Sequence, residues 1–154
     1  MAFVAKIDAR AYSRATEVSE RVVKAILNLY PEKFRELVNI ETTNVEGQSG
    51  HSILIVASRL EDKAGSEMTL DYIFRRLEER DRRSLSNSLL QRIDEKCTFF
   101  VRIDKQAAFL NNIGLAKGPD MISVQIHIRQ YPKCKQDDVR AMLEDRLQAA
   151  GGVD

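Results

Sequence analysis

Residues 121–131, which read MISVQIHIRQY, are the stretch of the chain that decides its fold class. Ile122, Val124, Ile126 and Ile128 alternate with polar side chains, and this period of two is typical of a β-strand that is buried on one face. Strands of a parallel sheet are covered on both faces and are apolar almost throughout. The alternation therefore predicts an antiparallel sheet with one open face.

The other strands follow from apolar periodicity and turn residues. They are predicted over residues 3–12, 39–46, 52–60 and 97–104. In residues 3–12 we expect Phe3, Ala5, Ile7 and Ala9 to share one face. The 52–60 strand is apolar over five consecutive residues, so we expect it to be central and covered on both faces.

Apolar residues at helical spacing predict the helices. These cover residues 17–29, 32–38 and 65–77, a segment that begins after Ser84, and a last helix that begins near Gln136. The resulting order is β-α-α-β-β-α-α-β-β-α. It predicts an α+β fold in which helices pack on one face of a mostly antiparallel sheet. A length of 154 residues fits a single domain, residues 1–154.

The charge balance excludes a strong global preference for nucleic acid or membrane. The chain has 24 Lys and Arg against 23 Asp and Glu, a net charge of +1. Any anion site must therefore come from local segregation of charge. No apolar run approaches the roughly 18 residues of a membrane span. The charged residues Lys6, Asp8 and Arg10 exclude a signal peptide, so we expect a cytoplasmic protein.

The sequence shows no constellation of residues for catalysis or metal binding. Its two histidines, His51 and His127, lack a recognisable Ser or Cys partner, and no phosphate-binding or zinc motif is present. We therefore expect no enzyme activity, metal or cofactor. Cys97 and Cys134 leave two alternatives open. They are reduced thiols, as the cytosol favours, or they form a disulfide at one end of the sheet.

Two segments are candidate phosphate sites. Gly47-Gln48-Ser49-Gly50 is either a plain hairpin turn or a loop whose Gly amides, together with His51, lie near a phosphate. The second segment is an arginine cluster that includes Arg75, Arg76, Arg82 and Arg83. It is either a solvated helix face with ion pairs or, at the predicted helix start after Ser84, an anion site.

The open face of the sheet is a third candidate. Strand alternation directs a mixture of basic, amide and aromatic side chains outward: Lys6, Arg10, Tyr12, Arg102, Gln125, His127 and Arg129. Such a face suits contacts with single-stranded RNA, and it equally suits a hydrated surface or a dimer contact.

The segment 99–109 passes from strand to helix without Gly or Pro. Asp104-Lys105-Gln106 stands at the junction. Asp at such a junction is a common helix N-cap, in which case Lys105 pairs with it. The other alternative is that Arg102, Lys105 and Gln106 contact RNA.

Three segments together resemble a known protein family. They are residues 47–57, residues 99–109 with the run Arg102 to Ala108, and residues 120–132. They resemble a small archaeal family of RNA-binding proteins, described as predicted exosome-associated subunits with a fold like ribosomal protein L five. The hairpin departs from that family at Ser52, where an Asn is usual.

The resemblance implies a non-catalytic RNA-binding protein in archaeal RNA processing or ribosome biogenesis, and a homodimer. We therefore expect phosphate contacts from a set of ten residues: Arg102, Lys105, Gln106, Gly47, Gly50, His51, Arg75, Arg76, Arg82 and Arg83. The alternative is a protein–protein interaction module, either a homodimer or an adaptor of an RNA-processing complex, that does not itself bind RNA.

Overall fold

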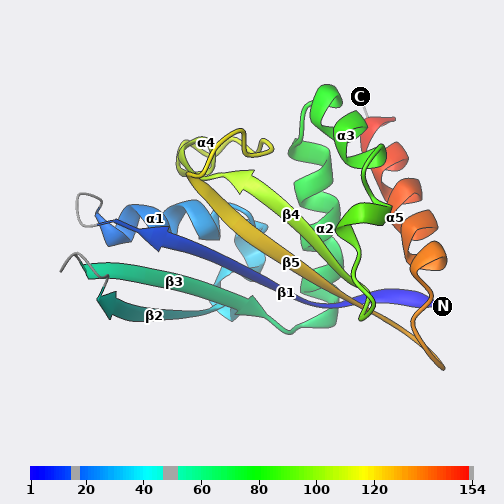
Figure 1. Cartoon of the computed structure of the whole chain (residues 1–154), viewed down its shortest axis with the longest axis horizontal. Helices are drawn as coiled ribbons and strands as arrows, with labels where there is room; N and C mark the ends of the chain where they lie inside the picture. Colours follow the sequence, from blue (N-terminus) through cyan, green and yellow to red (C-terminus); the bar gives the residue numbers. More distant parts are fainter. Residues whose placement is uncertain (15–17, 47–51, 153–154) are drawn as a thin grey trace.

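The computed structural model describes residues 1–14, 18–46 and 52–152. It confirms the α+β fold with a five-stranded antiparallel sheet in the order β2-β3-β1-β5-β4 (Figure 1). The strands are β1 (Ala2–Ser13), β2 (Asn39–Glu46), β3 (Ser52–Leu60), β4 (Thr98–Asp104) and β5 (Met121–Gln130). Strands β1 and β5 are the first and the last along the chain. They pair with each other, and β1 is the central strand of the sheet.

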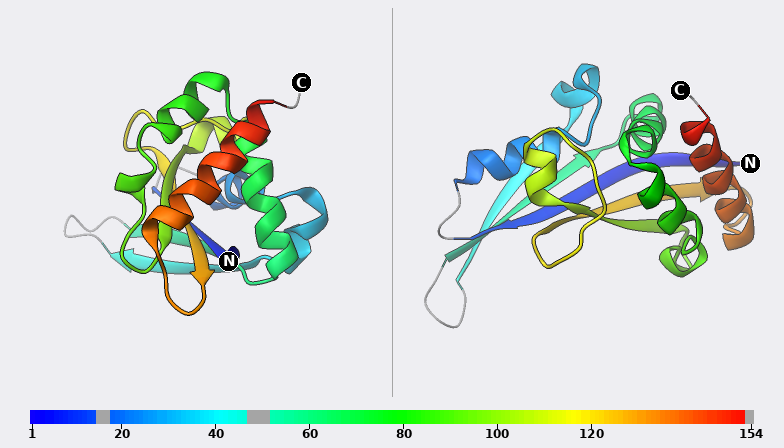
Figure 2. Two further views of the ribbon diagram at one scale, coloured as in Figure 1. Left: turned by 90° about the vertical axis from the view of Figure 1, so that its right-hand side faces the viewer. Right: turned by 90° about the horizontal axis from the view of Figure 1, so that it is seen from above.

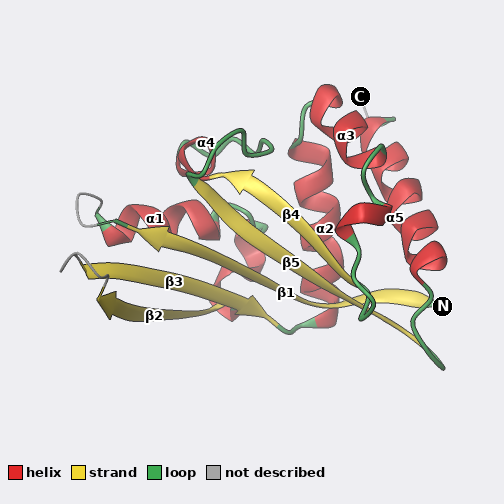
Figure 3. Ribbon diagram, viewed as in Figure 1, coloured by secondary structure: helices red, strands yellow, loops and turns green. Residues whose placement is uncertain are grey.

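The helices lie against the sheet and leave one of its faces open (Figure 2, right; Figure 3). They are α1 (Ser19–Leu27), α2 (Lys63–Arg76), α3 (Glu79–Ser86), α4 (Lys105–Phe109) and α5 (Gln136–Gly151), with 3₁₀ helices η1 (Glu32–Leu37) and η2 (Leu90–Arg92). Helices α1 and α2 pack on β1, and α5 packs on α2. In the described parts of the chain, no helix has the length and apolarity needed to cross a bilayer.

A β-bulge changes which side chains of β1 are buried. The pairing of β1 with β5 shifts register between Val4 and Lys6. Val4 and Ile7 are therefore both buried, at 0% and 1% exposure, although they are three residues apart. The prediction that Phe3 and Ala5 share the face of Ile7 was wrong, because the extra residue of a bulge reverses the alternation locally.

Strand β3 is not covered on both faces. It lies second from the edge, and within residues 53–60 only Val56, Ser58 and Leu60 are buried. Ile55 and Ala57 pair with residues of β1 on the open face and are only half-buried. The prediction of a doubly covered strand was wrong because all the helices that contact β3 lie on one side of it.

The prediction of a helix that begins after Ser84 is also wrong. Helix α3 begins at Glu79, directly after α2, and ends at Ser86. Acidic residues in its first turn, Glu79 and Asp81, favour this start because they interact well with the positive end of the helix dipole. Arg82 and Arg83 therefore lie inside α3, and no helix begins directly after Ser84 to offer the free amides on which the predicted phosphate site depended.

The two cysteines form a disulfide. Cys97 directly precedes β4, and Cys134 precedes α5. Their Cα atoms are 6.1 Å apart, within the usual range for a disulfide. The structure thus decides between the two alternatives, and the bridge ties the start of β4 to the segment before the last helix.

Candidate nucleic-acid interface

Side chains from all five strands form rows across the open face of the sheet. One row contains Glu41, Ala57, Arg10, Ser123 and Arg102, in the order β2, β3, β1, β5, β4. The row beside it contains Asn39, Arg59, Asp8, Gln125 and Phe100. Directly paired residues of a sheet point to the same face, so these side chains form one surface.

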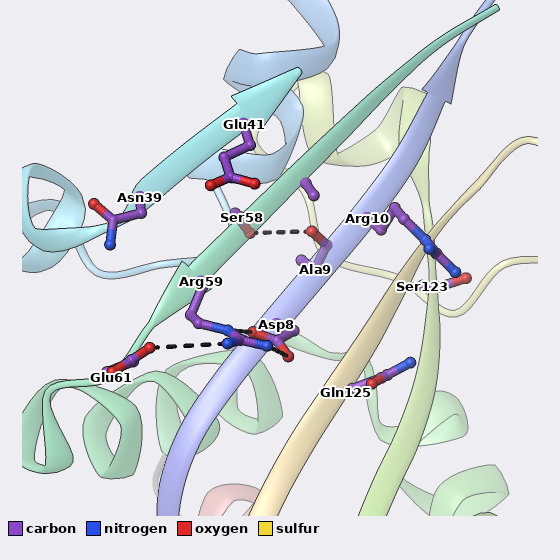
Figure 4. A pocket seen from close by; sticks show the side chains of 11 residues that line it. Asp8, Ala9, Arg10, Asn39, Glu41, Ser58, Arg59, Glu61, Ser123 and Gln125 are labelled. Atoms are coloured by element: carbon purple, nitrogen blue, oxygen red, sulfur yellow. Dashed lines mark hydrogen bonds and ion pairs between the residues drawn. The ribbon is translucent and has the colours of Figure 1, made fainter. Parts of the chain in front are cut away.

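Charge is segregated along this surface. Glu41 stands at the β2 end of its row, and Arg10 and Arg102 stand on β1 and β4. Glu61 follows β3 on the same side of the sheet as Glu41 (Figure 4). The open face is therefore acidic toward β2 and basic toward β4, although the chain as a whole is nearly neutral.

Toward β3, the remaining charges neutralise one another. The Arg59 guanidinium donates two hydrogen bonds to the Asp8 carboxylate, at 2.7 and 3.0 Å, and lies 3.9 Å from Glu61 (Figure 4). His127 Nε2 lies 3.0 Å from Oδ2 of the same carboxylate, the oxygen that also accepts the 3.0 Å bond from Arg59. Burial raises the pKa of Asp8, but the hydrogen bonds to His127 and Arg59 outweigh it and hold that pKa far below its usual range. Asp8 thus stays ionised and holds both partners.

The basic side differs, because its arginines lack acidic partners. Arg10 and Arg102 are exposed. Within residues 1–14, 18–46 and 52–152, no ion pair involves either of them. Ser123 stands between them on β5 and pairs with both. Two guanidinium groups free of carboxylates are a natural contact for phosphates.

A hollow of about 530 Å³ lies beside the outer edge of β4, next to Arg102. Its wall includes Phe100 and Arg102 of β4, Arg92 of η2, Ser84 of α3 and Lys117 of the loop before β5. Isolated bridges join β4 to its flanking segments at two points, Ile93 with Phe99 and Leu115 with Ile103. These bridges hold both walls of the hollow against the strand.

Two of the predicted contact residues, Lys105 and Gln106, have structural partners. Lys105 is only 4% exposed, and its ammonium group donates to the carbonyl oxygen of Tyr12 at 2.9 Å and pairs with Asp120 at 2.7 Å. Gln106 donates to the same Asp120 carboxylate at 2.9 Å. Partial burial raises the pKa of Asp120, but its bonds to Lys105 and Gln106 lower that pKa below the ordinary value.

Asp104 is the N-cap of α4. Its carboxylate accepts a hydrogen bond from the Ala107 amide at 3.0 Å. This confirms the capping alternative for Asp104. Lys105 pairs with Asp120 and not with Asp104, so the junction of β4 and α4 is fastened to the start of β5.

The arginine cluster does not converge on one surface. Arg82 donates to the carbonyl oxygens of Leu77 and Phe74, at the end of α2. Arg76 donates to the Tyr72 hydroxyl at 2.5 Å and to Asn111. Both arginines therefore fasten parts of the helix layer.

The other two arginines of the cluster lie elsewhere. Arg75 lines a surface hollow between α2 and α5 together with Asp71 and Arg146. Arg83 is exposed on α3. Gly47, Gly50 and His51 lie outside the described residues. Of the seven predicted contact residues that the structure describes, only Arg102 is placed on the basic part of the open face.

Phe100, Arg92 and Lys117 were missed by sequence reasoning. The alternation of β4 places Phe100 on the same face as Arg102, and this signal was available. Arg92 and Lys117 carry no such signal, because each is about ten or more residues from Arg102 and reaches it only through tertiary packing.

As far as the structure describes it, the open face carries one histidine, His127, whose ring lies between two polar side chains. His127 Nδ1 lies 3.4 Å from the Thr98 hydroxyl, so His127 stands between Thr98 and Asp8. The Asp8 carboxylate is shared with Arg59, and Thr98 is only 6% exposed. Among the residues that the structure describes, no group of three or more His, Cys, Asp or Glu is arranged to hold a metal ion.

Comparison with known proteins gives the family. RNA-binding protein PAB1135 of Pyrococcus abyssi is 32% identical over 136 residues, which are 88% of each chain. The crystal structure of protein AF2318 from Archaeglobus fulgidus superimposes with a TM-score of 0.78 at 25% identity and covers 93% of this chain and 99% of its own. Mth689 of Methanothermobacter thermautotrophicus, at 23% identity, shares the fold with a TM-score of 0.75 over 94% of this chain and 98% of its own. A family model described as RNA binding matches residues 6–128, and the chain belongs to this RNA-binding family.

Proposed function

We propose that this protein binds RNA without catalysis, through the basic part of its open sheet face, and that phosphate contacts supply most of the affinity. The observation that carries the proposal is the row from Glu41 to Arg102. Its charges give the open face an acidic side and a basic side, although the chain as a whole is nearly neutral. The family description and the name of the Pyrococcus abyssi relative support RNA as the ligand.

The geometry favours an RNA path along β5 and β4. Arg10 and Arg102 lie on either side of β5, while Glu41 and Glu61 repel phosphates from the β2 side. Phosphate contacts carry no sequence information, so we expect weak sequence preference and steep salt dependence. Lys105 is left out of the interface because it is buried against Tyr12 and Asp120.

Fluorescence anisotropy with a labelled RNA at several salt concentrations tests the proposal. Arg102→Ala and Arg10→Ala should each weaken binding and lower the salt slope by about one. Arg140→Ala is the matched control, because Arg140 is exposed on α5, on the helix side of the molecule, and should leave binding unchanged. No binding at low salt and micromolar protein would refute the proposal.

The proposed setting follows the resemblance of the sequence. We propose that the protein acts in RNA processing or ribosome biogenesis in the cytoplasm of an archaeon. We also propose that it forms a homodimer and associates with the exosome. Size-exclusion chromatography with light scattering measures the oligomeric state, and copurification with exosome subunits after nuclease treatment tests the association.

A second candidate function, a protein–protein interaction module, is favoured by one observation. Tyr12 and Val45 are exposed large side chains, at 52% and 43%, and Ile53 and Ile55 are only half-buried beside them. These four residues form an apolar patch on β1, β2 and β3, beyond Arg10 toward the end of β1. If the patch is the functional surface, partners should survive nuclease treatment and be lost in Tyr12→Ser, while Arg102→Ala should have no effect.

A further inference from the structure

The hollow beside β4 combines an excess of positive charge with an exposed aromatic ring. Arg92, Arg102 and Lys117 line it, whereas Asp81 is its one acidic residue among those described. The Asp81 carboxylate accepts a hydrogen bond from the Leu115 amide at 3.0 Å, so it is used to hold the loop. Three cations therefore face one carboxylate that already has a partner.

Arg92 shows that these cations lie close together. It is partly buried, and its guanidinium donates to the Ser88 hydroxyl at 2.9 Å. Burial lowers the pKa of Arg92, and the positive charge of Arg102 lowers it further. Like charges held together without a counter-charge repel each other, and a bound anion relieves that repulsion.

Phe100 presents an uncovered ring to the same hollow. It is 38% exposed. Several other aromatic rings carry a cation over one face, among them Phe3 under Lys63, Phe34 under Lys33, Tyr72 under Arg76 and Phe109 under Arg21 and Lys24. Across the residues that the structure places, no cation lies over the Phe100 ring, although three line the same hollow.

We infer that this hollow holds one unpaired nucleotide of a single-stranded RNA, with the base stacked on Phe100 and the phosphates bound by Arg92, Arg102 and Lys117. The inference rests on the proposed function and names the kind of RNA it requires. A base inside a duplex is already stacked on both faces, so only an unpaired base can use the ring. A volume of about 530 Å³ lies within the range of ligand pockets, roughly 300–1,000 Å³. The Ser84 hydroxyl and the Gln91 amide line the wall and supply donors and acceptors for the base edge.

The test compares one RNA sequence in two forms. Anisotropy is measured with a labelled 12-nucleotide single strand and with the same strand in a duplex. Phe100→Leu removes the ring but keeps an apolar side chain, Phe100→Tyr keeps the ring, and circular dichroism checks that each variant folds. Tyr131→Leu is the matched control, because Tyr131 is 69% exposed after the end of β5 and its ring does not line the hollow.

We expect Phe100→Leu to weaken binding of the single strand about tenfold, in line with the loss of one stacked base, and to change duplex binding by less than twofold. Phe100→Tyr should retain the affinity, and Tyr131→Leu should match the wild type. A 2-aminopurine base in the single strand should be quenched by the wild type and not by Phe100→Leu.

Three results would overturn the inference while RNA binding itself stands. They are an unchanged single-strand affinity in Phe100→Leu, an equal loss for both RNA forms, and competition by free AMP as strong as that by the oligonucleotide. If the wild type binds neither RNA at low salt, the proposed function fails, and the inference fails with it.

Discussion

The ammonium group of Lys105 donates a hydrogen bond to the carbonyl oxygen of Tyr12 at 2.9 Å, across 93 residues of sequence. The same group pairs with Asp120 at 2.7 Å. Lys105 thus joins the end of β1 to the start of α4 and to the turn before β5. A buried charge is tolerated at this point because a carbonyl and a carboxylate both compensate it.

Replacement of this lysine should affect stability and not RNA binding. We expect Lys105→Met to lower the free energy of unfolding by roughly 2 kcal/mol, since the Tyr12 carbonyl and Asp120 both lose a charged donor. Urea denaturation measures the loss. Lys133→Met, at an exposed position, should be neutral. If the Lys105→Met protein had wild-type stability but bound RNA more weakly, Lys105 would be a residue that contacts RNA.

The hydrogen bonds that Asp8 accepts from Arg59 and shares with His127 predict a loss of folding stability in acid. Because its bonds to His127 and Arg59 hold the pKa of Asp8 below the unfolded value of 3.8, the carboxylate stabilises the fold above that pH. This contribution decreases as pH falls below about 4, toward the lower folded pKa. Asp8→Asn should lower stability at pH 7 by on the order of 1–2 kcal/mol and flatten the pH dependence between pH 4 and pH 2.

Thermal or urea unfolding at several pH values distinguishes this outcome. An Asp8→Asn protein that loses stability in acid as steeply as the wild type would show that other carboxylates dominate. Glu36→Gln is a suitable control, because Glu36 is exposed on η1 and has no ion pair among the residues described.

The disulfide should make a large contribution to stability. Cys97 and Cys134 are 37 residues apart, and closing a loop of this length stabilises a protein by roughly 3–4 kcal/mol in the chain-entropy model. The urea midpoint should therefore fall when reductant is added, and the double variant Cys97→Ala/Cys134→Ala should be insensitive to reductant. Intact mass of the non-reduced protein gives an independent check, and two free thiols there would contradict the bridge.

The acidic end of the open face should limit where RNA binds. Glu41→Lys places a cation at the β2 end of the row that contains Arg10 and Arg102, so it should strengthen RNA binding several-fold at low salt and steepen the salt slope. Glu36→Lys makes the same charge change on the helix side of the molecule. If both variants gain affinity equally, net charge and not the sheet face controls binding.

Local patterns were sufficient to predict much of the fold. The alternation of residues 121–131 predicted an antiparallel sheet with one covered face, because a period of two reports directly which side chains are buried. Asp104 as an N-cap was among the alternatives for the same reason, since capping needs only the next three residues. Errors arose where packing changed a local pattern, at the bulge after Val4, in β3 and at the start of α3.

The candidate site was less predictable than the fold. The sequence predicted that Arg76 and Arg82 either form ion pairs on a solvated helix face or bind an anion. In the structure, the backbone carbonyl oxygens of Asn111 and Leu77 accept hydrogen bonds from these two arginines. Phe100 was overlooked because an aromatic residue in a strand is usually part of the core, whereas here Phe99 is buried and its neighbour faces outward.

Outside the bulge of β1, the sequence by itself determined which side chains share a face of a strand, because strand alternation depends only on neighbouring residues. Only the tertiary structure decided which side chains meet across strands and loops. Strand order and register bring Arg102 beside Arg92 and Lys117, and bring Lys105 onto Tyr12. These partners are far apart along the chain, so no local pattern of residues can report that they touch.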